Sequence, residues 1–399
     1  MRGTCSHPSP EALPPTSGQK ETQSLTRPAL AEITMPCSTP PEIFDLIVGW
    51  LRNEPTVLEA CCLVSKSWVP RTRRYLFASI HFFEPRSSIL SWTKVFPDPS
   101  NSPAQYTRNL TISEPLNAES TWIRSFHHVE NLTVYTVWFE DSGEVSLVQL
   151  HGLSPSLKSL CLSHRSLALS EVFTLACSFP LLQDLTVGRG GAGNESDEWV
   201  SPSTSSPRFT GTLHLGGGIR SATRGLLDLP GGLRFKTVVL QCPVEDAKSA
   251  MDLVLRCSDT LESLCYLFLL GYVPFLSGGL SMPYDKAVDS SGVPPPLDLS
   301  HAAKLKSVEL RFESLSARWI VATLQTAKTE FRRVTDFIGV CFDMVEEVDH
   351  REWQDLDHLL VRLWASHLIV PKLRYVVTKE ARSLVPTLLP ELVNRGLVD

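Results

Sequence analysis

The sequence lacks the short motifs that commonly accompany catalysis or cofactor binding. It contains no CxxC pair, no HExxH segment, no GxxxxGK[ST] phosphate loop and no GxSxG nucleophile elbow. Its 10 cysteines are scattered, and the adjacent pair Cys61 and Cys62 cannot supply half of a tetrahedral zinc site. We therefore expect reduced cysteines, no metal, no cofactor and no enzymatic activity.

Excess basic charge and long apolar runs are also missing. The net charge is −6, so no global positive field favours nucleic acid. The longest uncharged apolar stretch, residues 266–276, is about half of a bilayer span and contains Pro274. The first residues lack the apolar segment of a secretory signal. We expect neither a nucleic-acid nor a membrane partner, and a cytoplasmic and/or nuclear location.

The amino-terminal part changes character near residue 38. Residues 1–37 are rich in Pro, Ser and Thr without periodicity, so we expect a disordered leader. A helical pattern follows, with Thr39 and Glu42 spaced as a capping box. The apolar residues of this helix recur at helical spacing on one face and are Ile43, Leu46, Ile47, Trp50 and Leu51.

A second short helix is predicted after residue 55, with Leu58, Cys61 and Cys62 on one face. Pro70 is expected to break or open any helix beyond Trp68. The basic run Lys66, Arg71, Arg73 and Arg74 lacks interleaved aromatic residues. A polar rim beside a protein interface therefore explains it better than phosphate binding does.

An LxxLxL pattern with substitutions recurs from about residue 78 to 345. Its successive starts are 28, 25, 28, 25, 26 and 44 residues apart, and the long interval includes a Gly/Pro/Ser-rich insertion at about 275–298. Helical patterns lie between the motifs. This alternation predicts an α/β solenoid with a parallel sheet, although an ordinary α/β domain with coincidental spacing remains the alternative. The motifs are Val129/Leu132/Val134, Leu157/Leu160/Leu162, Leu182/Leu185/Val187, Thr210/Leu213/Leu215, Phe235/Val238/Leu240, Leu261/Leu264/Tyr266 and Leu305/Val308/Leu310.

Two further helices are predicted in residues 346–399, where they would cap the open end of the stack. The first places Trp353, Leu356, Leu360, Leu363 and Trp364 on one side. The second has Leu384, Leu388 and Leu392 four residues apart, with Pro386 and Pro390 inside it. The acidic residues here are expected to form a solvated helix entry rather than a metal or acid/base site, and are Glu346, Glu347, Asp349, Glu352, Asp355 and Asp357.

A glycine motif after a predicted strand resembles a dinucleotide-binding loop. Gly188, Gly190 and Gly193 have the spacing GxGxxG. The nucleotide motif requires a helix that starts at its last glycine, yet a Ser-Pro-rich segment without an apolar stripe follows. We interpret the segment as a loop between repeats.

Residues 39 to about 77 resemble an F-box. The elements that carry the resemblance are "TPPEIFDLIVGWL", "TVLEACCLVSKSW" and "RTRRYLF", and Thr39 stands where the family pattern has Leu. Together with "SWTKVFPDPSNSPAQYTRNLTI" and "REWQDLDHLLVRLW", the chain is similar to the large family of mushroom-type fungal F-box proteins over most of residues 36–375.

This resemblance implies a substrate-recruiting adaptor of a Skp-cullin-F-box ubiquitin ligase. The F-box would occupy residues 38–77 and bind the Skp linker subunit, while the downstream repeats would bind an unknown protein substrate. The residues implied at or near the Skp interface are Pro40, Pro41, Ile43, Leu46 and Ile47. Leu63, Val64 and Trp68 complete the implied Skp-binding set and would also close the small helical core. The alternative is a repeat scaffold without a ligase role, whose partner binding would not depend on residues 39–77.

The concave face of the predicted solenoid is the expected substrate surface. In each LxxLxL motif the second and third apolar residues point into the core, so the residues beside them point to the opposite face. Most of these are small and polar. The candidates for substrate contact are Tyr135, His214, Gln241, Glu309 and Arg311.

Overall fold

The computed structural model describes most of the chain between residues 40 and 396. The described ranges are 40–83, 88–113, 120–135, 147–163, 169–188, 207, 209–216, 219–229, 231–243, 246–269, 295–312, 317–326, 337–342, 350–365 and 385–396. The leader, Thr39, Gly190, Gly193, Leu384 and most of the predicted insertion lie outside them.

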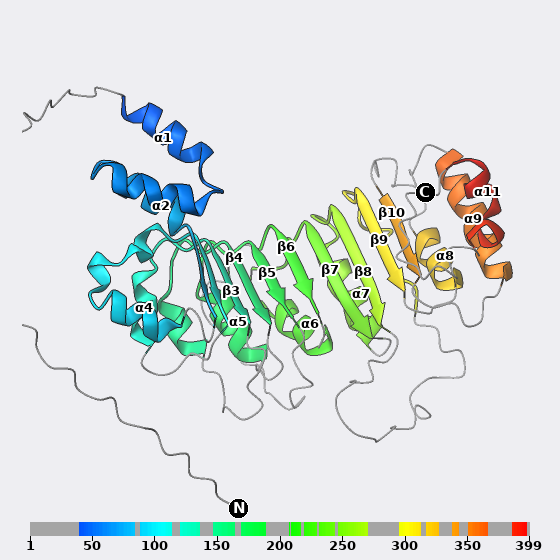
Figure 1. Cartoon of the computed structure of the whole chain (residues 1–399). Coiled ribbons are helices and arrows are strands. Elements are labelled where there is room, and N and C mark those ends of the chain that lie inside the picture. The colour runs from blue at the N-terminus through cyan, green and yellow to red at the C-terminus, as the bar shows by residue number, and fades with distance from the viewer. Residues whose placement is uncertain are drawn as a thin grey trace, which may run out of the picture.

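The described strands form one parallel sheet in an α/β fold, as the sequence predicts. Its ten strands lie side by side in sequence order, and its first and last strands are not joined (Figure 1). The strands are β1 (Ser79–Phe82), β2 (Asn109–Ile112), β3 (Asn131–Tyr135), β4 (Ser159–Ser163), β5 (Asp184–Val187), β6 (Thr212–Leu215), β7 (Thr237–Pro243), β8 (Ser263–Leu269), β9 (Ser307–Phe312) and β10 (Phe337–Phe342).

Each predicted LxxLxL motif provides one strand, from β3 to β9. The second residue of the motif is in register with its counterpart on the next strand, as in Leu132↔Leu160 and Leu160↔Leu185. Alternate residues are buried along these strands because a strand directs successive side chains to opposite faces. The same alternation builds β1 and β2, which precede the first motif.

The predicted motif Thr210/Leu213/Leu215 is wrong at its first residue. Thr210 is exposed, and Phe209 fills the core before β6 instead, with its ring stacked on Phe235 at 5.0 Å between centroids. The backbone approaches β5 closely here, because the Asp184 carboxylate accepts a hydrogen bond from the Thr212 amide at 2.5 Å. A Cβ on Gly211 would lie 2.1 Å from the same carboxylate, so only glycine fits without a shift.

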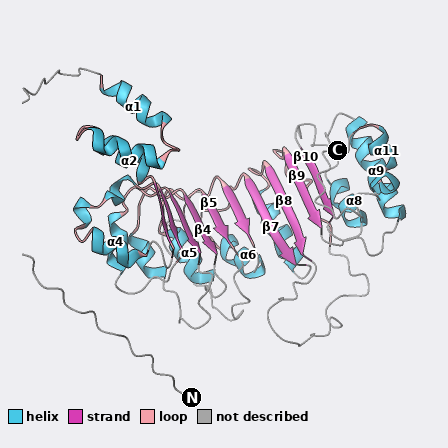
Figure 2. Cartoon of the chain, viewed as in Figure 1, coloured by secondary structure: helices cyan, strands magenta, loops and turns pink. Residues whose placement is uncertain are grey.

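Within the described residues, the connecting helices cover one face of the sheet and leave the other open (Figure 2). Apolar residues from both layers form one continuous core. These helices are α4 (Ile89–Val95), α5 (Leu169–Cys177), α6 (Ile219–Leu227), α7 (Ala247–Cys257) and α8 (Ala317–Thr326), with the short 3-10 segments η1 (Pro99–Asn101), η2 (Pro103–Tyr106), η3 (Ser120–Ser125) and η4 (Leu147–Gly152).

Three helices precede the sheet: α1 (Pro41–Trp50), α2 (Pro55–Val64) and α3 (Val69–Leu76). The predicted capping box is wrong, because Pro40 occupies the cap position of α1 and no side chain caps it. Pro70 does not interrupt a helix, since it lies in the first turn of α3 where its missing amide costs no hydrogen bond. These helices lie near the β1 end of the sheet (Figure 1).

The opposite end of the sheet carries α9 (His350–Ala365) and α11 (Pro390–Asn394). The predicted second helix is not continuous, because a separate turn at 385–388 ends before Leu389, which precedes Pro390 at the start of α11.

Two of the acidic residues in α9 serve as acceptors for other helices. Asp357 is not solvated as predicted. It is buried and accepts hydrogen bonds from the amides of Glu391 and Leu392, at 2.8 and 3.0 Å. Burial raises the pKa of its carboxyl despite these bonds. Glu352 accepts from the amide of Arg318 near the start of α8. Glu346, Glu347 and Asp349 lie outside the described residues.

Candidate protein-binding surfaces

The apolar stripe of α1 faces away from the other described elements. Ile43, Leu46, Ile47 and Trp50 expose 45, 64, 41 and 88% of their surface. We call these four residues the α1 stripe. Side chains this apolar are usually buried when they are grouped on a soluble domain, so a contiguous exposed group marks a binding surface. The stripe includes Ile43, Leu46 and Ile47 of the predicted Skp-binding set, while Pro40 is exposed just before the helix.

The inner side of this three-helix unit is built from other residues. Val48 and Leu58 are almost completely buried, and Cys61 is 8% exposed. The Sγ of Cys62 lies 2.8 Å from the Oγ1 of Thr72, which is itself buried in α3. The predicted face of α2 is therefore the inner face, and both cysteines are free.

Leu63 and Val64 do not close the helical core, contrary to the sequence prediction. They expose 88 and 70% of their surface at the end of α2. The inner positions of this helix are already filled by Leu58 and Cys61, which leaves its last turn directed outward. Trp68, by contrast, is half-buried and packs edge-on against Phe44 with 5.1 Å between ring centroids.

The basic run divides into two parts. The Nε of Arg71 lies 2.8 Å from Oδ1 of Asp45, so this guanidinium is used inside the unit. Lys66, Arg73 and Arg74 are exposed. The run is thus not a uniform rim, and its first arginine holds α3 to α1.

The open face of the sheet carries the predicted substrate-contact residues. One row across it follows the strand register, and its members are His81, Thr111, Thr133, Cys161, Thr186, His214, Val239, Cys265 and Glu309. Most of these side chains are half-buried. Most side chains in this row are small and uncharged. The few larger side chains on the face are therefore the ones expected to contribute most to contact with a partner.

His214 and Gln241 come together on neighbouring strands. Their Nε2 atoms lie 3.4 Å apart across β6 and β7. Burial lowers the pKa of His214, because desolvation disfavours the charged imidazolium. This pair therefore presents neutral hydrogen-bonding groups near pH 7.

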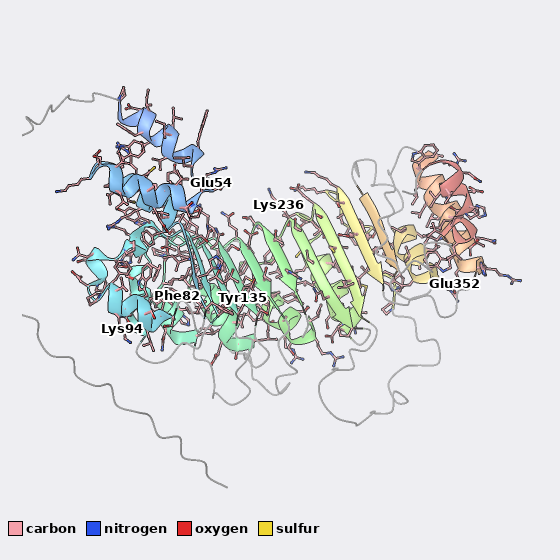
Figure 3. The ribbon with its side chains drawn as sticks, viewed as in Figure 1. Glu54, Phe82, Lys94, Tyr135, Lys236 and Glu352 are labelled. Carbon is pink, nitrogen blue, oxygen red and sulfur yellow. The ribbon has the colours of Figure 1, made fainter. Side chains whose placement is uncertain are left out.

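The remaining candidates lie apart from this pair. Tyr135 ends β3 and is 41% exposed, three strands from His214 (Figure 3). Glu309 lies three strands away on the other side, in β9. At ~4.8 Å per strand, each gap is about 14 Å, so the candidates span an extended surface rather than a pocket. Arg311 belongs to β9, and its side chain lies outside the described part.

Gly188 has a structural role in the sheet. A Cβ at this position would lie 2.7, 2.9 and 3.1 Å from Oγ, Cβ and Cα of Ser163 on the adjacent strand. Its amide donates to the carbonyl of Leu162 at 2.7 Å. Close approach of two strands accounts for the first glycine of the GxGxxG spacing.

Charged residues form a ladder along the edge where the strands begin. Glu130 binds Lys158 at 2.8 Å and lies 3.6 Å from Arg108. Glu262 bridges Lys306 at 2.5 Å and Lys236 at 3.8 Å (Figure 3 labels Lys236). The lysine in each case lowers the pKa of the glutamate.

Trp50 is missing from the predicted Skp-binding set, although 88% of its surface is exposed beside the predicted residues of α1. The helical periodicity placed Trp50 on the same face as Leu46 and was available as a signal. A periodic stripe identifies which residues share a face but does not say whether that face meets the chain itself or a partner.

Within the described residues, no helix combines the length and apolar character needed to cross a membrane. In the same part of the chain, no group of three or more His, Cys, Asp or Glu side chains is placed to hold a metal ion. No protein-family model matches the chain, and a search of curated proteins finds no match.

Proposed function

We propose that this chain is a substrate-recruiting adaptor of a Skp-cullin-F-box ubiquitin ligase. Residues 38–77 form the F-box that binds the Skp linker. Residues 78–345 form a leucine-rich-repeat-like solenoid that binds a target protein, and residues 346–399 cap its far end. An adaptor of this kind needs no catalytic group, because other subunits carry out ubiquitin transfer.

The exposed α1 stripe is the observation that carries the proposal. Three residues that the F-box resemblance implies at the Skp interface, Ile43, Leu46 and Ile47, are exposed apolar side chains in a helix whose inner face is already packed. A unit of about 40 residues has little core of its own, so burial of this stripe against a partner is favourable.

A scaffold without a ligase role explains the open sheet face equally well. It gives no function to the α1 stripe, which lies on a separate element from the sheet. The adaptor accounts for both surfaces.

The test is capture of a Skp linker by the full chain and by the double variant Ile43→Asp/Leu46→Asp. Two charges in a desolvated interface should weaken binding by more than about 100-fold. Leu255→Asp is the matched control, because Leu255 is 46% exposed on α7 and far along the chain. Undiminished capture by the double variant, with an unchanged melting temperature, would remove the F-box assignment.

A further inference from the structure

The attachment of α1 depends on a few side chains of α3 and the turn before it. Phe44 packs edge-on against Trp68, with 5.1 Å between centroids and 70° between ring planes. Val48 is fully buried, and a Cβ on Gly49 would lie 3.4 Å from the hydroxyl of Tyr75. The inner side of the helix is therefore fixed at its first and its last turns.

Arg71 joins two of these contacts. Its Nε lies 2.8 Å from Asp45, and its guanidinium carbon lies 5.9 Å from the centre of the Phe44 ring. The Arg71 side chain is 28% exposed and that of Asp45 is 56% exposed. One guanidinium thus contacts both a carboxylate and an aromatic ring on α1, an arrangement that lysine does not reproduce.

The two residues that Arg71 contacts, Phe44 and Asp45, lie on the same helix as the α1 stripe. Phe44 and Asp45 lie between Ile43 and Leu46 in the sequence, so any rotation of α1 that breaks their contacts also turns the stripe. The orientation of the stripe is coupled to Arg71 through the helix backbone.

We propose that Arg71, together with Asp45 and Phe44, is a positioning residue for the docking surface. It fixes the rotation and tilt of α1 before the partner arrives, so that the stripe is preorganised and less ordering entropy is lost on binding. This inference rests on the proposed function, because the partner is the Skp linker. It adds a residue that touches no partner and acts through α1.

The variants separate positioning from stability. The ion pair between Arg71 and Asp45 is partly exposed and contributes little to folding, so Arg71→Met should leave the melting temperature nearly unchanged. The same variant should weaken linker binding by about 3- to 10-fold, mainly through faster dissociation. Arg73→Met, at an exposed position of the same helix, is the matched control and should bind as the wild type does.

Charge exchange supplies the decisive measurement. Arg71→Asp should weaken linker binding, because it places two carboxylates side by side. The double variant Asp45→Arg/Arg71→Asp restores a pair of opposite charges and should recover at least half of the loss, measured as the logarithm of the affinity. The experiment titrates purified Skp linker from a mushroom-type fungus into the full-length variants by calorimetry. Equal binding by Arg71→Met and wild type, no recovery in the exchange variant, or an equal loss in Arg73→Met would each overturn the proposal.

Hydrogen exchange tests the positioning role of Arg71 without the Skp linker. Arg71→Met should accelerate exchange of the amides in α1 and leave those of β4 and β5 unchanged. A wild-type chain that binds no linker overturns the proposed function alone. In that case faster exchange in α1 still supports the positioning role of Arg71, and unchanged exchange overturns it.

Discussion

Single residues in this protein are constrained mainly by close approach between neighbouring strands. Gly188 faces Ser163, and Gly211 faces Asp184. A parallel ladder brings each residue within about 5 Å of its counterpart, so a residue without a Cβ permits a contact that others cannot make. These glycines show how close approach between strands restricts the choice of residue within the sheet.

Gly188→Ala should destabilise the protein by about 1 to 3 kcal/mol, because the added methyl group overlaps the backbone and side chain of Ser163. Gly152→Ala is the control, since its nearest neighbour would be the flexible Arg124 side chain at 3.4 Å. Chemical unfolding of both variants measures the difference. Equal stability of the two would contradict the close-packing explanation.

At the scale of elements, polar groups at the strand starts tie neighbouring units together. Glu130 and Glu262 each bridge two basic residues, which come just before the strands on either side. Hydrogen bonds between backbone amides and carbonyls join the same neighbouring segments. The lysine contacts lower the pKa of both carboxyls in the folded state. Their stabilising effect is therefore present above the ordinary glutamate pKa and is lost as pH falls through the lowered value.

Glu262→Gln should consequently lower the melting temperature at pH 7, and the difference from wild type should vanish in acid. Added salt should also reduce it, because the pair is near solvent. Melting curves over a pH series, with Glu59→Gln on α2 as a control, test this. A difference that persists at a pH well below the lowered pKa of Glu262, where the carboxyl is protonated in both the folded and the unfolded chain, would show that the carboxylate charge is not responsible.

At the scale of the whole molecule, the two candidate surfaces lie on different parts of one chain. The α1 stripe precedes the sheet, whereas Tyr135, His214 and Gln241 lie on its open face. If both proposed partners bind, the separation would let one protein hold them at once. Binding of one partner should then be insensitive to substitutions in the surface for the other.

Tyr135→Ala should weaken capture of a substrate protein by about 1 to 2 kcal/mol, since exposed tyrosines often dominate interface energies. Binding of the Skp linker should remain at the wild-type level. Paired pull-downs against both partners, with Leu181→Ala as a control for an exposed apolar residue in a turn, measure this. Loss of linker binding in Tyr135→Ala would contradict the separation, and full retention of the substrate would place recognition elsewhere than this tyrosine.

The α/β class and seven of the strands, from β3 to β9, follow from the pattern of residues alone. Alternation such as Leu132 with Val134 has period two, and its repeat spacing fixes which residues face the core. The pattern did not reveal β1, β2 or β10, because those strands lie before and after the run of seven motifs. It also missed the shift from Thr210 to Phe209, since the path of the chain into β6 involves the hydrogen bond from the Thr212 amide to the Asp184 carboxylate on β5.

Which faces of the described elements remain open depends on how the elements pack together. The helical spacing of Ile43, Leu46, Ile47 and Trp50 is identical whether the stripe packs inward or outward, and packing of Phe44 and Val48 against α3 turns it outward. The same limit applies to Leu63, Val64 and Asp357, whose exposure depends on partners distant in the sequence. Local periodicity shows which side chains share one face of a helix or strand. Whether that face is buried depends on whether another element packs against it.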